Sequence, residues 1–204
     1  MKKLLVALAL MGVLAGGAMA QTWEDWGLGG TMGMFFSSTD FTDANTNIDP
    51  ALNTPFDAYV VILGCQYAGL GGYEVGITVP AEILALNATG TNGWTNFGGS
   101  NFNHLVGFMT PLPIVNGNAI LSTLSLMCLS PAAHDVTFGP ANPSSFADIG
   151  GGIAEGGNPD NLDVCTLTAG GDESFIGVVA TINGGGIVVP TENDTWTGVK
   201  DLFR

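Results

Sequence analysis

The sequence predicts an all-β fold, a two-sheet β-sandwich that ends in a short helical tail. Glycine supplies 31 of the 204 residues and proline 10, and this glycine content is about twice the average usage. The apolar runs between these turn-forming residues are short, and they lack a helical period until the last residues of the chain. Many short strands joined by turns are typical of sandwiches with Greek-key or jelly-roll connections.

The expected strands follow from their apolar patterns. The stretch 58–65 is a nearly continuous apolar run, as in a central strand. Tyr73, Val75 and Ile77 alternate with small or polar residues, which indicates a strand with one exposed face. The other predicted strands lie at 30–37, 102–108, 119–129, 136–138, 162–167 and 175–182. The segment 80–86 fits either a helical turn or a strand.

The first 20 residues are predicted to be a cleavable secretory signal peptide. Lys2 and Lys3 precede an apolar run over 4–14, and Ala18 and Ala20 have the small side chains that a signal peptidase reads. The run is shorter than the roughly 20 residues that span a bilayer, and no later stretch is long and apolar enough to do so. We therefore expect a secreted, cell-surface or periplasmic protein without a transmembrane segment.

The rest of the chain is predicted to hold one domain of ordinary size. A lead-in over 21–29 follows the signal peptide, and the sandwich occupies 30–189. A linker and the tail then occupy 190–204.

The chain is strongly acidic, with 18 Asp and Glu residues against four Lys and Arg. Lys2 and Lys3 belong to the predicted signal peptide, so Lys200 and Arg204 are the basic residues that remain. Nucleic-acid binding depends on Lys and Arg against phosphates, and anionic membrane surfaces are disfavoured for the same reason. We therefore expect no nucleic-acid partner, and cations, basic proteins or neutral glycans are the partner classes that fit the charge.

The three cysteines, Cys65, Cys128 and Cys165, all lie in apolar segments. An oxidising compartment permits a disulfide, but an odd number leaves at least one thiol without a partner in the chain. Three buried thiols and one bridge with one free thiol are both open. The cysteines form no C-x-x-C motif, so no zinc site is expected.

Three pairs of stretches resemble a known group of proteins. They are 56–63 with 71–75, 105–113 with 121–124, and 138–140 with 156–162. Together they are similar to uncharacterised secreted bacterial proteins with a cohesin-like or immunoglobulin-like β-sandwich. The resemblance implies a cohesin-like or jelly-roll sandwich that serves as a non-catalytic surface, adhesion or scaffolding module, and it carries over no site residues.

The sequence offers little for catalysis. Its only histidines are His104, on an apolar strand face, and His134, beside Asp135 in a predicted loop. The chain has no G-x-S-x-G elbow around a serine nucleophile. With 18 acids, some carboxylate pairs arise by chance and carry little information about glycoside hydrolysis. We therefore expect a protein that is not an enzyme.

Calcium is the best metal hypothesis, although no cofactor is otherwise expected. The stretch from Asp43 places Asn45, Asn47 and Asp49 at alternate positions, and Asp40 adds a carboxylate. Hard cations take such oxygen ligands, but a polar turn rich in Asn and Asp has the same composition. A second, weaker candidate set joins three acids from the C-terminal half: Glu155, Asp160 and Asp163.

A glycan site is the other binding hypothesis. The polar loop 92–99 carries Trp94 and Phe97 among Asn and Gly residues. An exposed aromatic ring beside amide groups suits stacking on a sugar face. The alternative is that Trp94 turns inward and closes the edge of the sandwich.

The C-terminal tail is predicted to form a short helix. Trp196, Val199 and Phe203 follow one face at helical spacing, and Lys200 stands in the last turn, where the helix dipole favours a cation. The segment resembles short "W-G-x-V-K" tails of other secreted bacterial proteins, which implies sorting or docking. A helix that merely ends the fold is the alternative.

Overall fold

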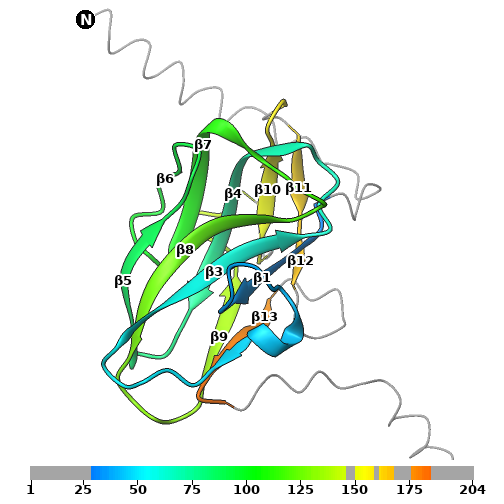
Figure 1. The fold of residues 1–204 in the computed structure, drawn as a ribbon. Coiled ribbons are helices and arrows are strands. Elements are labelled where there is room, and N and C mark those ends of the chain that lie inside the picture. The colour runs from blue at the N-terminus through cyan, green and yellow to red at the C-terminus, as the bar shows by residue number, and fades with distance from the viewer. Residues whose placement is uncertain (1–28, 146–149, 159–160, 168–175, 185–204) are drawn as a thin grey trace, which may run out of the picture.

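A computed structural model describes residues 29–145, 150–158, 161–167 and 176–184. In these residues the chain forms 13 strands and one short 3-10 helix, η2 (Asp43–Asn45), and the strands form two sheets (Figure 1). The predicted two-sheet all-β sandwich is confirmed. The predicted helical tail lies outside the described residues, as do the signal peptide and nearly all of the lead-in.

The first sheet has five strands in the order β12-β1-β3-β8-β5. Neighbours are antiparallel, except that β1 pairs with β12 in parallel. The strands are β1 (Thr31–Phe35), β3 (Pro55–Leu63), β5 (Ile83–Thr89), β8 (Ala119–Cys128) and β12 (Thr166–Leu167).

The second sheet has eight strands, six of them in the order β11-β10-β4-β9-β13-β2. One edge of β4 pairs with β10 and β9, and its other edge pairs with β7. β6 in turn pairs with β7. The strands are β2 (Asn47–Ile48), β4 (Gly69–Thr78), β6 (Thr95–Asn96), β7 (Asn103–Pro113), β9 (His134–Gly139), β10 (Gly152–Glu155), β11 (Leu162–Val164) and β13 (Gly177–Ile182).

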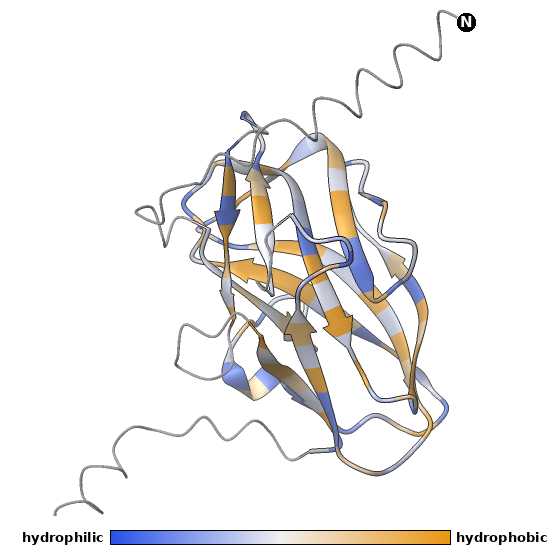
Figure 2. Ribbon diagram, turned by 180° about the vertical axis from the view of Figure 1, so that it is seen from behind, coloured by the Kyte–Doolittle hydropathy of each residue, from blue (hydrophilic) through white to orange (hydrophobic). Residues whose placement is uncertain are grey.

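The core lies between the two sheets and follows the two-residue period of the strands. Ala58, Val60 and Ile62 of β3 are fully buried, and so are Leu124 and Leu126 of β8. The second sheet contributes Tyr73, Val75 and Ile77 of β4 in the same way. Figure 2 shows this alternation as bands of hydrophobic and less hydrophobic residues along the strands.

Most predicted strands appear at or near their expected positions, with three differences. The run 162–167 is divided at Cys165 into β11 and β12, because the chain passes there from one sheet to the other. The ambiguous segment 80–86 leads into a strand, β5, and not into a helix. The sequence patterns did not indicate β2, β6 or β10, which have two, two and four residues.

Glycines let β4 approach its neighbours closely. A Cβ on Gly72 would meet the carbonyl oxygen of Val106 in β7, and a Cβ on Gly76 would meet that of Pro140, each well inside van der Waals contact. Both obstacles are backbone atoms, which move only if a strand moves. The two glycines therefore fix how β4 sits between β7 and the end of β9.

Candidate interaction site

A hydrogen-bonded aromatic cluster lies on the inner face of the second sheet, formed by Tyr73 of β4, His104 of β7 and Trp94, which directly precedes β6. The Trp94 indole Nε1 donates to the Tyr73 hydroxyl over 3.2 Å, and that hydroxyl lies 2.9 Å from Nδ1 of His104. The His104 ring stands edge-on to both Trp94 and Tyr73. His104 is fully buried and Tyr73 nearly so. The cluster therefore closes this side of the sandwich from within.

The partners of His104 fix its tautomer. Nε2 lies 3.1 Å from the carbonyl oxygen of Asn101, which can only accept, so Nε2 carries the proton. Nδ1 then accepts from the Tyr73 hydroxyl, and that oxygen accepts from Trp94. Burial lowers the pKa of His104 to about 4, against a smaller opposing effect of the Asn101 carbonyl. The imidazole is thus neutral and fully occupied, and it serves packing.

The outer face of the same strand pair exposes a short apolar row. Alternation along β7 turns His104 and Val106 inward and Leu105 and Met109 outward. Thr95 pairs with Gly107, and the Phe97 N–H donates to the Leu105 carbonyl, so Phe97 shares the outer face. Met109 is 87% exposed and Phe97 73%. We call Phe97, Leu105 and Met109 the apolar row.

Glycines shape the surface around the apolar row. The Phe97 ring lies over Gly107, where an added Cβ would stand 3.5 Å from ring carbon Cε2. The Met109 side chain lies against Gly93, and a Cβ there would come within 2.6 Å of the Met109 Cβ. Both exposed side chains thus rest on backbone that carries no side chain of its own.

The amide side chains beside the row are already paired within the chain. Asn96 accepts from the N–H groups of Gly98 and Leu105 and donates to the carbonyl of Ser100. Asn92 donates to the carbonyl of Pro111. Asn103 holds the neighbouring loop through its own amide bonds. These amides shape the loop and offer few free groups to a ligand.

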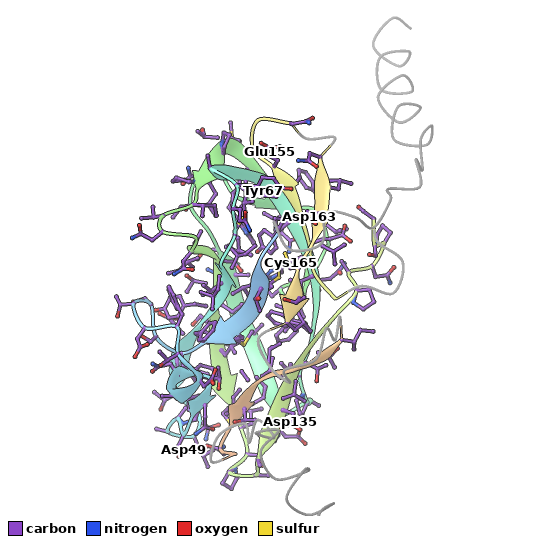
Figure 3. All side chains as sticks on the ribbon, turned by 90° about the vertical axis from the view of Figure 1, so that its right-hand side faces the viewer. Asp49, Tyr67, Asp135, Glu155, Asp163 and Cys165 are labelled. Carbon is purple, nitrogen blue, oxygen red and sulfur yellow. The ribbon has the colours of Figure 1, made fainter. Side chains whose placement is uncertain are left out.

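Charge is distributed unevenly around the sandwich. Residues 83–134, which form β5, β6, β7 and β8, contain no Asp, Glu, Lys or Arg. Figure 1 draws β5, β6 and β7 toward one side of the sandwich and β10, β11 and β12 toward the other, with β8 crossing between the two sides. Seen from that other side in Figure 3, Asp49, Asp135, Glu155 and Asp163 all lie in view.

The uncharged segment 83–134 also holds most of the exposed large apolar side chains. Among the described residues these are Leu84, Leu86, Phe97, Met109, Val115 and Leu129, with Leu52 and Ile176 elsewhere. Leu84 and Leu86 in β5 have acids nearby, because Glu82 precedes the strand and Asp57 of β3 pairs with Ser125 of β8. The apolar row lies on the other sheet, where Glu74 of β4 pairs with Leu105.

Glu74 is a buried acid, and the chain covers it. Its side chain is 8% exposed, and Oε1 accepts from the Ser144 hydroxyl over 2.7 Å and from the Ser145 N–H over 2.9 Å. Hydrogen bonds to an ionised carboxylate are among the stronger ones in proteins. Glu74 therefore anchors the segment after β9 and presents little charge to the surface.

The first candidate calcium set lies at one end of the sandwich. Asp43 and Asn45 belong to η2 and Asn47 to β2. Several of the oxygens have local partners: Asp40 Oδ1 accepts from the Thr42 N–H, and Asn47 Oδ1 accepts from the Thr181 hydroxyl. In the part of the chain that the structure describes, no group of three or more His, Cys, Asp or Glu comes together as a metal site would require.

The second candidate calcium set is represented by Glu155 and Asp163, since Asp160 lies outside the described residues. Glu155 accepts from Asn161, and Asp163 accepts from the Tyr67 hydroxyl over 3.2 Å. Burial and the charge of Asp163 raise the pKa of Tyr67 to about 12. Figure 3 places these two acids at the end of the sandwich opposite Asp49.

The reactive side-chain types lie in the core. All three cysteines are unpaired, buried thiols, and burial raises the pKa of Cys65 and Cys165. Cys128 donates to the Ser130 carbonyl over 2.9 Å. His134 is not in a loop, as the sequence indicated, but begins β9 and is 6% exposed. Of the two open thiol arrangements, the structure has three buried thiols.

The predicted glycan pair is split between two faces. Trp94 is half-buried with its indole N–H bonded to Tyr73, while Phe97 stands outside. This matches the alternative in which Trp94 closes the edge of the sandwich. The predicted tail residues Trp196, Val199, Lys200 and Phe203 lie outside the described residues.

Met109 and Leu105 were missed by the sequence interpretation. Their signal was present in the strand alternation, since a strand that buries His104 and Val106 must turn Leu105 and Met109 outward. The absence of charge over 83–134 was a second signal in the sequence.

Comparison with known proteins gave structural similarities only. No family model and no curated sequence matches the chain. A cohesin module from the family 33 glycoside hydrolase of Clostridium perfringens has a TM-score of 0.47 and 12% identity, and the match covers 76% of this chain and 97% of that one.

The sixth cohesin of scaffoldin B from Acetivibrio cellulolyticus, solved in complex with a mutant Cel5 dockerin, has a TM-score of 0.48 and 10% identity. That match covers 76% of this chain and 99% of the cohesin. Both similarities are low in sequence and in structure, and the sandwich of this chain is defined by its own strand pairings.

Proposed function

We propose that the chain is a non-catalytic protein-binding module that acts outside the cytoplasm. The observation that carries the proposal is the apolar row, in which Phe97 and Met109 are 73% and 87% exposed and belong to a segment, 83–134, that contains no Asp, Glu, Lys or Arg. Large apolar side chains that cluster on an exposed surface mark interaction sites. Aromatic residues and methionine are enriched in the cores of protein interfaces, and charged residues are depleted there.

The polar surroundings favour a protein over a sugar as the ligand. A sugar site needs free hydrogen-bonding groups around the stacking ring. Here the amides of Asn92, Asn96 and Asn103 are bonded within the chain, and the Trp94 indole is turned inward. An apolar centre with a polar rim whose groups are already paired is the anatomy of a protein contact.

The interior supports a role without catalysis. A nucleophile needs an adjacent base with a pKa near the working pH. His104 has a pKa of about 4 and both ring nitrogens bonded, and burial raises the pKa values of the Cys65 and Cys165 thiols. The buried histidine and thiols therefore contribute to the core, and we assign the binding role to the surface of the sandwich.

Site-specific photo-crosslinking tests the proposal. A photoreactive phenylalanine analogue replaces Phe97 in the exported chain, in the cells that produce it. We expect a covalent adduct of discrete mass after irradiation. The same analogue at Ile176, which is 52% exposed and lies outside the uncharged segment, is the matched control. Equal adducts at both positions, or none at Phe97, would contradict a contact through the apolar row.

A further inference from the structure

We infer that the apolar row binds a second copy of this chain, so that the module self-associates through its uncharged side. The inference rests on the proposed function and names the partner of the same surface. Three observations carry it: the net charge of the molecule, the position of the charges, and the exposure of Phe97 and Met109.

The net charge restricts how two copies can meet. Each copy carries a formal charge of −14, and the described residues include no Lys or Arg that could pair with a carboxylate of the other copy. A contact through β10, β11 or η2 would oppose the acids of two copies, and like charges opposed across an interface cost several kcal/mol. A basic partner would instead be drawn to those acids.

A contact through the uncharged segment 83–134 avoids this repulsion between opposed acids. Segment 83–134 contributes no ionised side chain, and the carboxylate of Glu74, opposite Leu105, is covered by Ser144 and Ser145. Two apolar rows can thus face each other without desolvating an exposed charge of the described residues of β4, β6 and β7. The repulsion that remains acts between the distant acids of the two copies and is screened by salt.

The apolar row supplies the attraction. Phe97 and Met109 rest on Gly107 and Gly93, so both project from a surface of bare backbone. A two-fold arrangement would bury four such side chains, because the same patch serves both copies. Aromatic and thioether groups pack against each other favourably, and methionine adapts its shape to the contact.

Sedimentation of the purified exported chain tests the inference. We expect a reversible monomer–dimer equilibrium whose dissociation constant falls several-fold as NaCl is raised from 0.1 to 0.5 M, because salt screens the repulsion between two acidic copies. The double variant Phe97→Ser/Met109→Ser should raise the dissociation constant by at least about tenfold, since burial of each of the two apolar side chains contributes about a factor of ten to the affinity. The control Ile176→Ser should associate like the parent.

The outcomes separate the inference from the proposed function. A chain that is monomeric at all salt concentrations overturns self-association, as does a dimer that the double variant leaves intact. If the Phe97 adduct then contains a different protein, the binding function stands and the self-association is wrong. An adduct with twice the mass of the chain, whose cross-linked peptide comes from this sequence, supports both. Circular dichroism confirms that the variants keep the sandwich.

Discussion

Tyr73 links two elements of the sandwich through a single hydroxyl. This hydroxyl of β4 donates to His104 of β7 and accepts from Trp94, which directly precedes β6. A buried polar group that loses its partner costs about 1–3 kcal/mol. The hydrogen bonds therefore fix how the three rings of the inner aromatic cluster are oriented.

Replacing Tyr73 by Phe should lower the free energy of unfolding by about 2 kcal/mol, because the Trp94 N–H and His104 Nδ1 each lose their partner. Urea unfolding followed by tryptophan fluorescence measures the change. Tyr59→Phe is the control, since its hydroxyl forms no hydrogen bond with another described residue and the side chain is only half-buried. Equal losses in the two variants would contradict the network.

His104 predicts a pH dependence of stability. Its pKa is about 4 in the folded chain and about 6.5 when exposed, so the unfolded chain binds a proton in this window that the folded chain does not. The free energy of unfolding should therefore fall as the pH drops from 6.5 to 4, by up to about 3 kcal/mol. His104→Gln lacks this proton, so the stability gap between parent and variant should narrow at low pH. A gap that is constant with pH would exclude the effect.

The buried thiols predict slow alkylation. Burial raises the pKa of Cys65 and Cys165 and keeps reagents away from both sulfurs. We expect the native chain to resist iodoacetamide at pH 8 and the chain in guanidinium chloride to take up three labels, counted by mass spectrometry. One label after unfolding without a reductant would show a disulfide and contradict the arrangement of three thiols.

At the scale of elements, β4 depends on glycine more than its sequence pattern indicates. Gly72 pairs with Gly107 of β7 on one side and with Ala154 of β10 on the other. The alternation of Tyr73, Val75 and Ile77 predicted the strand and its buried face. It could not predict the close approach to Val106, because that contact depends on which strand becomes the neighbour.

Gly72→Ala should destabilise the fold by about 1–3 kcal/mol, because the new methyl group meets the backbone of Val106 and strands must shift to admit it. Gly157→Ala is the control, because no heavy atom lies within 4 Å of the added Cβ there. Thermal unfolding of both variants gives the comparison. A Gly72 variant as stable as the control would contradict the close packing of β4 on β7.

The other elements show how much of the fold the sequence predicts. Long runs such as 119–129 predicted β8 almost to the residue, since ten apolar or small residues in a row leave few alternatives. Strand β5 stayed ambiguous because Leu84 and Leu86 are exposed on an edge strand, which breaks the alternation. The two-residue strands are defined by their partners alone, and no local pattern specifies a partner distant in sequence.

The candidate site was predictable only in part, for the same reason. Trp94 and Phe97 stood out as aromatic residues in a polar loop, but which of them faces inward depends on the β6–β7 register. Met109 followed from the period of β7 once that strand was recognised. The pairing of the Asn side chains with backbone groups could not be predicted, because it depends on the loop conformation.

For the whole molecule, the excess of acids should make stability depend on salt. Like charges destabilise the compact state, and screening relieves them. We expect the melting temperature to rise between 0.02 and 0.5 M NaCl. Calcium chloride at equal ionic strength is the matched comparison for the calcium hypothesis, since a further rise with calcium alone would indicate specific binding. A melting temperature that falls with NaCl would contradict the repulsion.

The two parallel pairings have a consequence for the order in which the chain is made. β1 needs β12 beside it, and β2 needs β13, so the earliest strands meet partners that lie more than 130 residues later. A chain that emerges from a ribosome or from a membrane pore N-terminus first has no finished sandwich until Ile182 has appeared. Contacts this distant in sequence form slowly. The architecture thus delays its own completion until the last of the described strands has been made.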